Sequence, residues 1–382
     1  MGRGHGEGIV GLVLAGGLAQ RMGKCKALLP INGKSALELI ANRMRESRIE
    51  RIVVVTGGHE RLVHEEARRL GCLPVHNPAY KSGMYSSVLA GVRALPPGTE
   101  AFFLLPVDTP MIRTSTYRSL IGAFYENSAR ADILYPTFKG EEGHPPLIGR
   151  SLVDKILRWR GTDGLRGFFK DHPSRALHVA TADRGTQFDM DTPDDYDALL
   201  SYASVEFLPD ESECEELLEI AGTPRRVIRH MRTVAVCGQK LAHALGKKGI
   251  RLNTKLVFSS CMLHDIAKGE HDHEEKGAGW LRKRGYVEVA AIVATHKDLP
   301  ERKKIGEAEV LYLADKLVDG EVISTLERRM KRMESRFAPG SESLLAAKKR
   351  IDQAKKIQRA IEKVTCHTIA EILLAPSESS DP

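Results

Sequence analysis

The sequence lacks the features that would place it among secreted, disulfide-bonded or membrane-spanning proteins. Its six cysteines form no C-x-x-C pair and no other close cluster, which argues against a zinc knuckle or a disulfide framework and fits a reducing compartment. No apolar run approaches the roughly 20 residues of a membrane span. The run from Ile9 to Ala15 is short and lacks the flanking pattern of a signal peptide. We therefore expect a cytoplasmic protein with no membrane partner.

Aromatic residues are also scarce, at 5% of the chain, and no basic stretch is interleaved with them. A stacking platform for single-stranded nucleic acid is therefore not expected. The net charge of +7 has two interpretations, a solvated basic surface or a nucleic-acid partner. We favour the solvated surface.

The first two hundred residues show strand and helix patterns in alternation. Buried strands are predicted at Ile9–Ala15, Arg51–Thr56 and Ala101–Val107, and helices at Ser35–Glu46 and Met84–Leu95. Continuous apolar strands separated by helices are typical of a mostly parallel sheet covered on both faces. The predicted fold class is α/β, with a Rossmann-like domain over residues 8–203.

The second half has a different character. The segment from Glu206 to Glu219 holds seven acidic residues and no basic ones, which predicts an exposed acidic linker over residues 204–222. Helical patterns follow at 224–246, 253–267, 273–284, 286–296 and 307–336, and a basic helical tail ends near Leu374. We predict an all-α domain over residues 223–325 and a C-terminal helical extension over 326–376.

The first candidate site is a glycine-containing loop directly after the first predicted strand, LAGGLAQRMGKCKALLP at residues 14–30. The pair Gly16–Gly17 allows a backbone to curve closely around a ligand and to point successive N–H groups at phosphate oxygens. Arg21 and Lys26 can add positive charge against a triphosphate. Asp108 follows another predicted strand, at the edge of a parallel sheet where ligands bind, and its carboxylate suits Mg²⁺.

Together with four later segments, this loop resembles the molybdenum-cofactor nucleotidyltransferases within the MobA-like NTP-transferase family. The later segments are NPAYKSGMYSS at 77–87, GHP at 143–145 with GTDGLR at 161–166, and DMDTP at 189–193. The resemblance implies that Asp108 and Asp191 hold Mg²⁺. It implies nucleotide binding by Leu14, Ala15, Gly16, Gly17, Arg21, Lys26 and Asp108. It implies an acceptor side formed by Ser82, Gly83, Met84, His144 and Pro145.

The implied reaction is attack by a substrate phosphate on the α-phosphorus of an NTP, with release of pyrophosphate. Arg21, Lys26 and Asp108 would carry it by positioning and charge neutralisation. The R-M-G-x-x-K spacing, the GHP motif and the D-x-D-T-P ending resemble the cytidylyltransferase branch, which implies CTP. The Ala-Gly-Gly of the loop differs from the Ala-Ala-Gly usual in that branch, so GTP stays open.

The resemblance also implies a phosphorylated small-molecule acceptor such as a molybdopterin-type cofactor, with a molybdoenzyme or chaperone as a possible protein partner. The alternative acceptor is a sugar or polyol phosphate, because sugar nucleotidyltransferases share the glycine loop and the catalytic aspartate.

The second candidate site is a set of six residues within or beside the predicted helices of the second half: His230, His264, Asp265, His273, His296 and Asp315. One histidine of this kind is usually a satisfied core or surface residue. Six candidates from five helices indicate a common centre instead. Imidazole and carboxylate together suit Mn²⁺, Fe²⁺, Ni²⁺ or Zn²⁺ rather than Ca²⁺.

These residues resemble the HD superfamily of metal-dependent phosphohydrolases over about residues 224–320. The minimal H…HD…D set is matched by His230, His264, Asp265 and Asp315, and the extra histidines of two-metal members are matched by His273 and His296. The segment Met262–Lys268 (MLHDIAK) is a specific marker.

The HD resemblance implies one or two transition metals, with Asp265 as a bridging, catalytic ligand and Lys268 as a catalytic contact to phosphate during hydrolysis of a phosphoester. A different possibility is that this half senses a ligand and regulates the transferase. His243 and His271 fall outside the pattern and are expected to face solvent.

Overall fold

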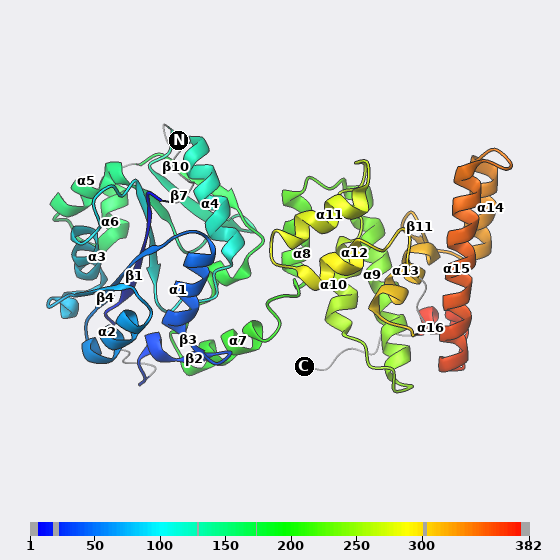
Figure 1. Cartoon of the computed structure of the whole chain (residues 1–382), viewed down its shortest axis with the longest axis horizontal. Helices are drawn as coiled ribbons and strands as arrows, with labels where there is room; N and C mark the ends of the chain where they lie inside the picture. The colour runs from blue at the N-terminus through cyan, green and yellow to red at the C-terminus, as the bar shows by residue number, and fades with distance from the viewer. Residues whose placement is uncertain (1–6, 18–22, 128–129, 173, 301–303, 376–382) are drawn as a thin grey trace. The chain divides into compact units, whose positions relative to one another are not determined.

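The computed structural model describes residues 7–17, 23–127, 130–172, 174–300 and 304–375. The chain divides into two compact units, Met1–Glu206 and Phe207–Pro382 (Figure 1). None of the helices in these described ranges is long and apolar enough to cross a lipid bilayer.

The first unit is built on an eight-stranded sheet in the order β10-β7-β9-β6-β1-β4-β5, with β8 paired to β7. Its strands are β1 (Ile9–Ala15), β4 (Arg51–Thr56), β5 (Leu73–His76), β6 (Ala101–Pro106), β7 (Ile133–Phe138), β8 (Glu141–Glu142), β9 (Leu147–Gly149) and β10 (Ala176–Ala180). Strand β1 runs parallel to both β4 and β6, whereas β9 runs antiparallel to β6 and β7. The predicted mostly parallel sheet is confirmed.

Helices cover both faces of this sheet (Figure 1). They are α1 (Ala36–Glu46), α2 (Glu60–Arg69), α3 (Met84–Arg93), α4 (Thr114–Asn127), α5 (Val153–Arg158) and α6 (Gly164–Asp171). Helix α7 (Pro193–Ala203) packs instead in a separate cluster with Leu29 and Ile31. Successive side chains of β1 point to opposite faces. Ile9 and Val13 therefore join a core with α1, α2 and α4. Val10 and Leu12 join a second core with α3, α5 and α6.

The second unit is helical. Its helices are α8 (Glu211–Ile220), α9 (Arg225–Gly246), α10 (Thr254–Leu263), α11 (His273–Arg282), α12 (Val287–Val293), α13 (Glu307–Leu317), α14 (Leu326–Arg336), α15 (Glu342–Thr365) and α16 (Ile369–Leu374). The helices predicted between 224 and 296 are present, and so is the basic tail that ends at Leu374.

The prediction of one continuous helix over residues 307–336 was wrong. Helix α13 ends at Leu317, and a short hairpin of β11 (Val318–Asp319) and β12 (Val322–Ile323) separates it from α14. Gly320 turns this hairpin with a φ of +65°, a conformation that costs glycine little and other residues more. Among the residues that the structure describes in the second unit, this hairpin contributes the only strands, and the other named elements are helices.

The acidic segment over 204–222 is not an exposed linker, contrary to the prediction. Glu206 is buried, and its carboxylate pairs with the Arg43 guanidinium of α1 at 2.5 Å. Helix α8 then buries Cys214, Leu217 and Leu218 and contacts α10. An acidic amphipathic helix and a solvated linker share a composition, but the apolar residues three and four apart mark the helix.

Because α8 packs into the core of the second unit, we expect a fragment of residues 207–382 to unfold at a higher temperature than a fragment that begins at residue 222. Full burial of one leucine side chain contributes roughly 1.5–3 kcal/mol, and α8 contributes two fully buried leucines. Thermal unfolding followed by circular dichroism, with equal metal present, measures the difference. Equal midpoints would show that α8 adds nothing to this core.

Candidate active sites

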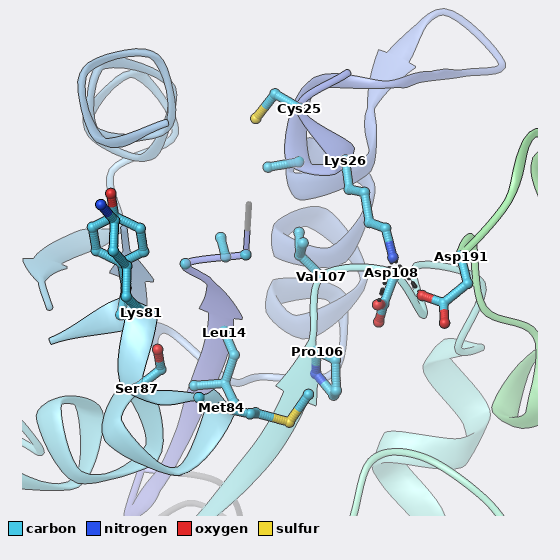
Figure 2. Close-up of a pocket in the computed structure, with 16 residues that line it drawn as sticks. Leu14, Cys25, Lys26, Lys81, Met84, Ser87, Pro106, Val107, Asp108 and Asp191 are labelled. Atoms are coloured by element: carbon cyan, nitrogen blue, oxygen red, sulfur yellow. Dashed lines mark hydrogen bonds and ion pairs between the residues drawn. The ribbon is translucent and has the colours of Figure 1, made fainter. Parts of the chain in front are cut away.

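The first pocket forms where the glycine loop and Asp108 meet at one edge of the sheet. Strands β1 and β6 are parallel neighbours with Leu14 opposite Pro106, so the segments that follow them emerge side by side. A cavity of about 480 Å³ lies there (Figure 2). The predicted residues that line it are Leu14, Ala15, Gly16, Gly17, Lys26, Gly83, Met84, Asp108 and Asp191.

Lys26 connects the two aspartates of this pocket. Its Nζ lies 3.1 Å from Asp108 Oδ2 and 2.6 Å from Asp191 Oδ1 (Figure 2). Burial alone would lower the pKa of Lys26, but the two carboxylates raise it above its usual value. Partial burial, together with the carboxylates of Asp191 and Asp108, also raises the pKa of Asp189. Two carboxylates in contact with one ammonium, with the Asp189 carboxylate nearby, fit a site for a divalent cation that bridges phosphates.

Local sequence fixes Asp191. Thr192 caps helix α7 by accepting from the Asp195 backbone N–H at 3.2 Å, and the Asp195 carboxylate accepts from the Thr192 N–H at 2.9 Å. Pro193 occupies the first turn of the helix, where its missing N–H costs nothing. The Asp191 carboxylate is therefore held at the start of a well-capped helix.

The segment at 77–87 packs directly against the glycine loop. Buried Asn77 donates through Nδ2 to Ser86 Oγ at 2.8 Å and to Ser87 Oγ at 3.0 Å. A Cβ on Gly16 would lie 3.1 Å from Ser87 Oγ, so a larger residue would crowd this contact. Lys81, within this segment, was not predicted as a site residue. It lines the pocket across from Lys26 (Figure 2).

Some predicted residues of the acceptor side do not line this cavity. Ser82 ends the short 3₁₀ turn Tyr80–Ser82 and is exposed. His144 and Pro145 lie between β8 and β9, where the His144 N–H donates to the Thr186 carbonyl at 2.9 Å. None of these three lines the cavity in the described ranges. Arg21 lies outside the described residues.

In the second unit, the predicted set of six converges. Two groups could each hold a metal ion, with ligand atoms within 4.8 Å of one another: His230, His264 and Asp265, and Asp265, His273 and His296. Asp265 is common to both groups. Its Oδ1 lies 3.2 Å from His273 Nε2 and 3.3 Å from His296 Nε2, and its Oδ2 lies 3.6 Å from His264 Nε2. Asp315 Oδ1 lies 3.3 Å from His230 Nε2.

Comparison with known proteins identifies one known domain in each unit. Residues 11–177 match the MobA-like NTP transferase domain, and residues 227–319 match the HD domain. The chain is 30% identical over 190 residues to the molybdenum cofactor cytidylyltransferase of Escherichia coli, covering 48% of this chain and 92% of that protein. The chain belongs to the MobA-like NTP transferase family.

Two further relatives cover the same half. The purine catabolism protein PucB of Bacillus subtilis is 27% identical over 203 residues, which is 50% of this chain and 94% of that protein. A nucleotidyl transferase structure from Methanothermobacter is 20% identical with a TM-score of 0.45, covering 53% of this chain and all 100% of that chain. The first unit is a nucleotidyltransferase domain, and the second carries an HD domain.

The histidines of the HD domain are oriented by backbone carbonyls. The Nδ1 atoms of His230, His264 and His296 lie 2.8, 2.9 and 2.7 Å from the carbonyls of Gly320, Cys261 and Val293. A neutral imidazole that donates from Nδ1 presents a bare lone pair at Nε2. These lone pairs face carboxylate oxygens, and buried His264 Nε2 makes no hydrogen bond. Two acceptors that face each other need a proton or a metal ion between them. Burial alone would lower the pKa of His230, but the neighbouring carboxylate of Asp315 raises it. Imidazole nitrogens and carboxylate oxygens that converge in this way fit a metal ion.

Protonation states in the HD domain also fit metal binding. Burial lowers the pKa of His264 to about 4. Burial alone would raise the pKa of Asp265, but the surrounding histidines and Lys268 hold it well below its usual range. Neutral imidazole and ionised carboxylate are the forms that bind metals.

Two lysines border this centre. Lys268 Nζ lies 2.9 Å from Asp265 Oδ2, beside the centre as its predicted role requires. Lys316 was not predicted. It is buried, and its Nζ donates to the His296 carbonyl at 2.8 Å and to Asp315 Oδ2 at 2.7 Å. His243 and His271 are exposed, as predicted.

Proposed function

We propose that the protein is a bifunctional enzyme. Its transferase domain transfers CMP from CTP to a molybdopterin-type cofactor and releases pyrophosphate. Its HD domain hydrolyses a phosphoester. The observation that carries the first activity is the meeting of Lys26, Asp108 and Asp191 in the glycine-loop pocket. The observation that carries the second is the pair of ligand groups that share Asp265.

In the transferase, the backbone of Gly16–Gly17 and the side chains of Arg21 and Lys26 bind the triphosphate. Asp108 and Asp191 would hold Mg²⁺, which when bound neutralises charge on the phosphates. Lys26 contacts both carboxylates. Its ammonium therefore lies beside the proposed binding site of the triphosphate. Gly83 and Met84 line the same cavity and would contact the acceptor.

In the HD domain, the six histidines and aspartates would hold two ions of Mn²⁺, Fe²⁺, Ni²⁺ or Zn²⁺. Such ions supply a water of lowered pKa and stabilise charge on phosphate. The carbonyl bonds at Nδ1 keep the Nε2 atoms aimed at the centre. Lys268 binds a phosphate oxygen from the open side, because its side chain is half-exposed whereas Asp265 is buried.

One assay tests the transferase proposal. The protein is incubated with Mg²⁺, one NTP at a time, and either molybdopterin cofactor or a panel of sugar and polyol phosphates, and pyrophosphate release is measured. Release only with the pterin cofactor supports the proposal. Release only with a sugar or polyol phosphate would replace the acceptor.

We expect CTP to be preferred over GTP. The R-M-G-x-x-K spacing and the D-x-D-T-P motif at 189–193 motivate this choice. Equal concentrations of both nucleotides compete in one tube with the pterin cofactor, and mass spectrometry of the products gives the ratio. A larger share of the guanine product would contradict the expectation.

A further inference from the structure

A cavity of about 580 Å³ opens beside the HD centre. One side of it is formed by Asp265, His273, His296 and Asp315, and the other by α14 and α15. These two helices lie in the C-terminal extension, which matches neither family model. The extension therefore contributes to the same cavity as the proposed metal ligands.

Helices α14 and α15 are fixed to the segments that carry those ligands. Arg350 of α15 forms a two-pronged ion pair with Asp298, at 2.8 and 2.9 Å, two residues after His296. Gln353 Nε2 donates to the Leu299 carbonyl at 2.7 Å. Arg329 of α14 donates from Nη1 to the Asp315 carbonyl at 2.6 Å. The two helices are thus a built wall of the cavity.

The lysine and arginine side chains that line this cavity differ in their contacts. Most already have partners: Lys297 pairs with Glu274, Lys316 with Asp315, and Arg350 with Asp298. Arg336 also lines the cavity, yet its guanidinium makes no hydrogen bond or ion pair within the described part of the chain. It lies over the Phe337 ring, 5.6 Å from the centroid.

Apolar residues form the middle of the wall, and Glu342 and Ser343 line it at the start of α15. Met333 lies between Arg329 and Arg336 at helical spacing on α14, and Phe337 ends the helix. Ala346 and Ala347 face the cavity from α15. Because these alanines are small, they leave space in front of Met333 and Phe337 for a flat or apolar group.

We propose that α14 and α15 are the substrate-binding wall of the HD site and that Arg336 binds a second anionic group of the substrate. The substrate class is then a phosphate ester with a flat or apolar middle and a second negative charge remote from the cleaved phosphate. This inference rests on the proposed hydrolysis at the HD centre. Arginine forms strong charge-assisted bonds to phosphate and carboxylate, so the second charge selects the substrate.

The test uses the full chain with Mn²⁺ and p-nitrophenyl phosphate as the hydrolysed probe. Adenosine 3′,5′-bisphosphate and adenosine 5′-monophosphate, which differ by one phosphate, compete with the probe. We expect the bisphosphate to inhibit about tenfold more strongly. In Arg336→Ala the ratio should fall to about one, whereas Arg328→Ala, an exposed charge loss on the same helix, should keep it. A ratio near one in the unaltered protein, or one that survives in Arg336→Ala, overturns the inference.

A second measurement tests anion binding by Arg336 independently of the proposed hydrolase activity. If no metal supports cleavage of the probe, the proposed hydrolase function fails, and amide hydrogen exchange decides on the wall. The bisphosphate should slow exchange in peptides from residues 326–351, more than the monophosphate does, and this difference should vanish in Arg336→Ala. Equal exchange with both compounds would show that Arg336 binds no second anion.

Discussion

Asp108→Asn is expected to lower nucleotidyl transfer by roughly a hundredfold or more while phosphoester hydrolysis stays unchanged. The substitution keeps the size of the side chain and removes its charge. The Asp108 carboxylate lies 3.1 Å from Lys26 Nζ. Within the described residues, the substitution therefore leaves Asp191 as the carboxylate that pairs with this ammonium. Pyrophosphate release under saturating NTP and Mg²⁺ measures the loss.

Asp154→Asn is the matched control, because Asp154 is an exposed residue in the first turn of α5. Its transfer rate should equal that of the unaltered protein. Near-normal transfer by Asp108→Asn would remove Asp108 from the catalytic site. A loss of hydrolysis as well as transfer would indicate a general folding defect instead.

Asp265→Asn is expected to abolish metal binding and hydrolysis together. Asp265 is the one residue that both ligand groups share, and an amide has neither the charge nor the second acceptor oxygen that bridging two ions requires. Metal content after dialysis, measured by atomic emission, should fall to near zero. Transfer by the first domain should persist, which shows that the chain is folded.

His273→Ala provides the graded comparison. It belongs to only one of the two groups, so we expect loss of mainly one ion and of most of the rate. His271→Ala is the matched control, since its ring is exposed and two residues away. One equivalent of metal in the unaltered protein, with His273→Ala fully active, would leave only a single-metal centre.

The central strands of the sheet could be predicted because they are buried on both faces. Strands β1, β4 and β6 are continuous apolar runs, and their predicted bounds agree with the structure within one residue. The outer strands gave no such signal. β5 and β10 bury few of their side chains, and edge strands of this kind need few apolar residues.

The candidate ligands of both sites could be predicted from motifs, but their surroundings could not. The carbonyl partners of His264 and His296 lie near helix ends, and that of His230 lies in the hairpin turn at Gly320. A backbone carbonyl is present whatever the residue type, so no sequence motif marks these partners. Lys316 sits next to Asp315 in the sequence, yet its contact with the His296 carbonyl depends on how α13 packs. The wall formed by α14 and α15 arises from tertiary packing of a segment without a motif.

The turn of the hairpin between α13 and α14 is expected to tolerate no insertion. Exposed two-residue turns are usually places where insertions are tolerated. Here the turn supplies the Gly320 carbonyl that lies 2.8 Å from His230 Nδ1, and its neighbour Glu321 pairs with Arg229 at 2.6 Å. An inserted residue would displace the acceptor that orients a proposed ligand. The length of this exposed turn is thus tied to the proposed metal centre, unlike that of the turn at Gly249 between α9 and α10.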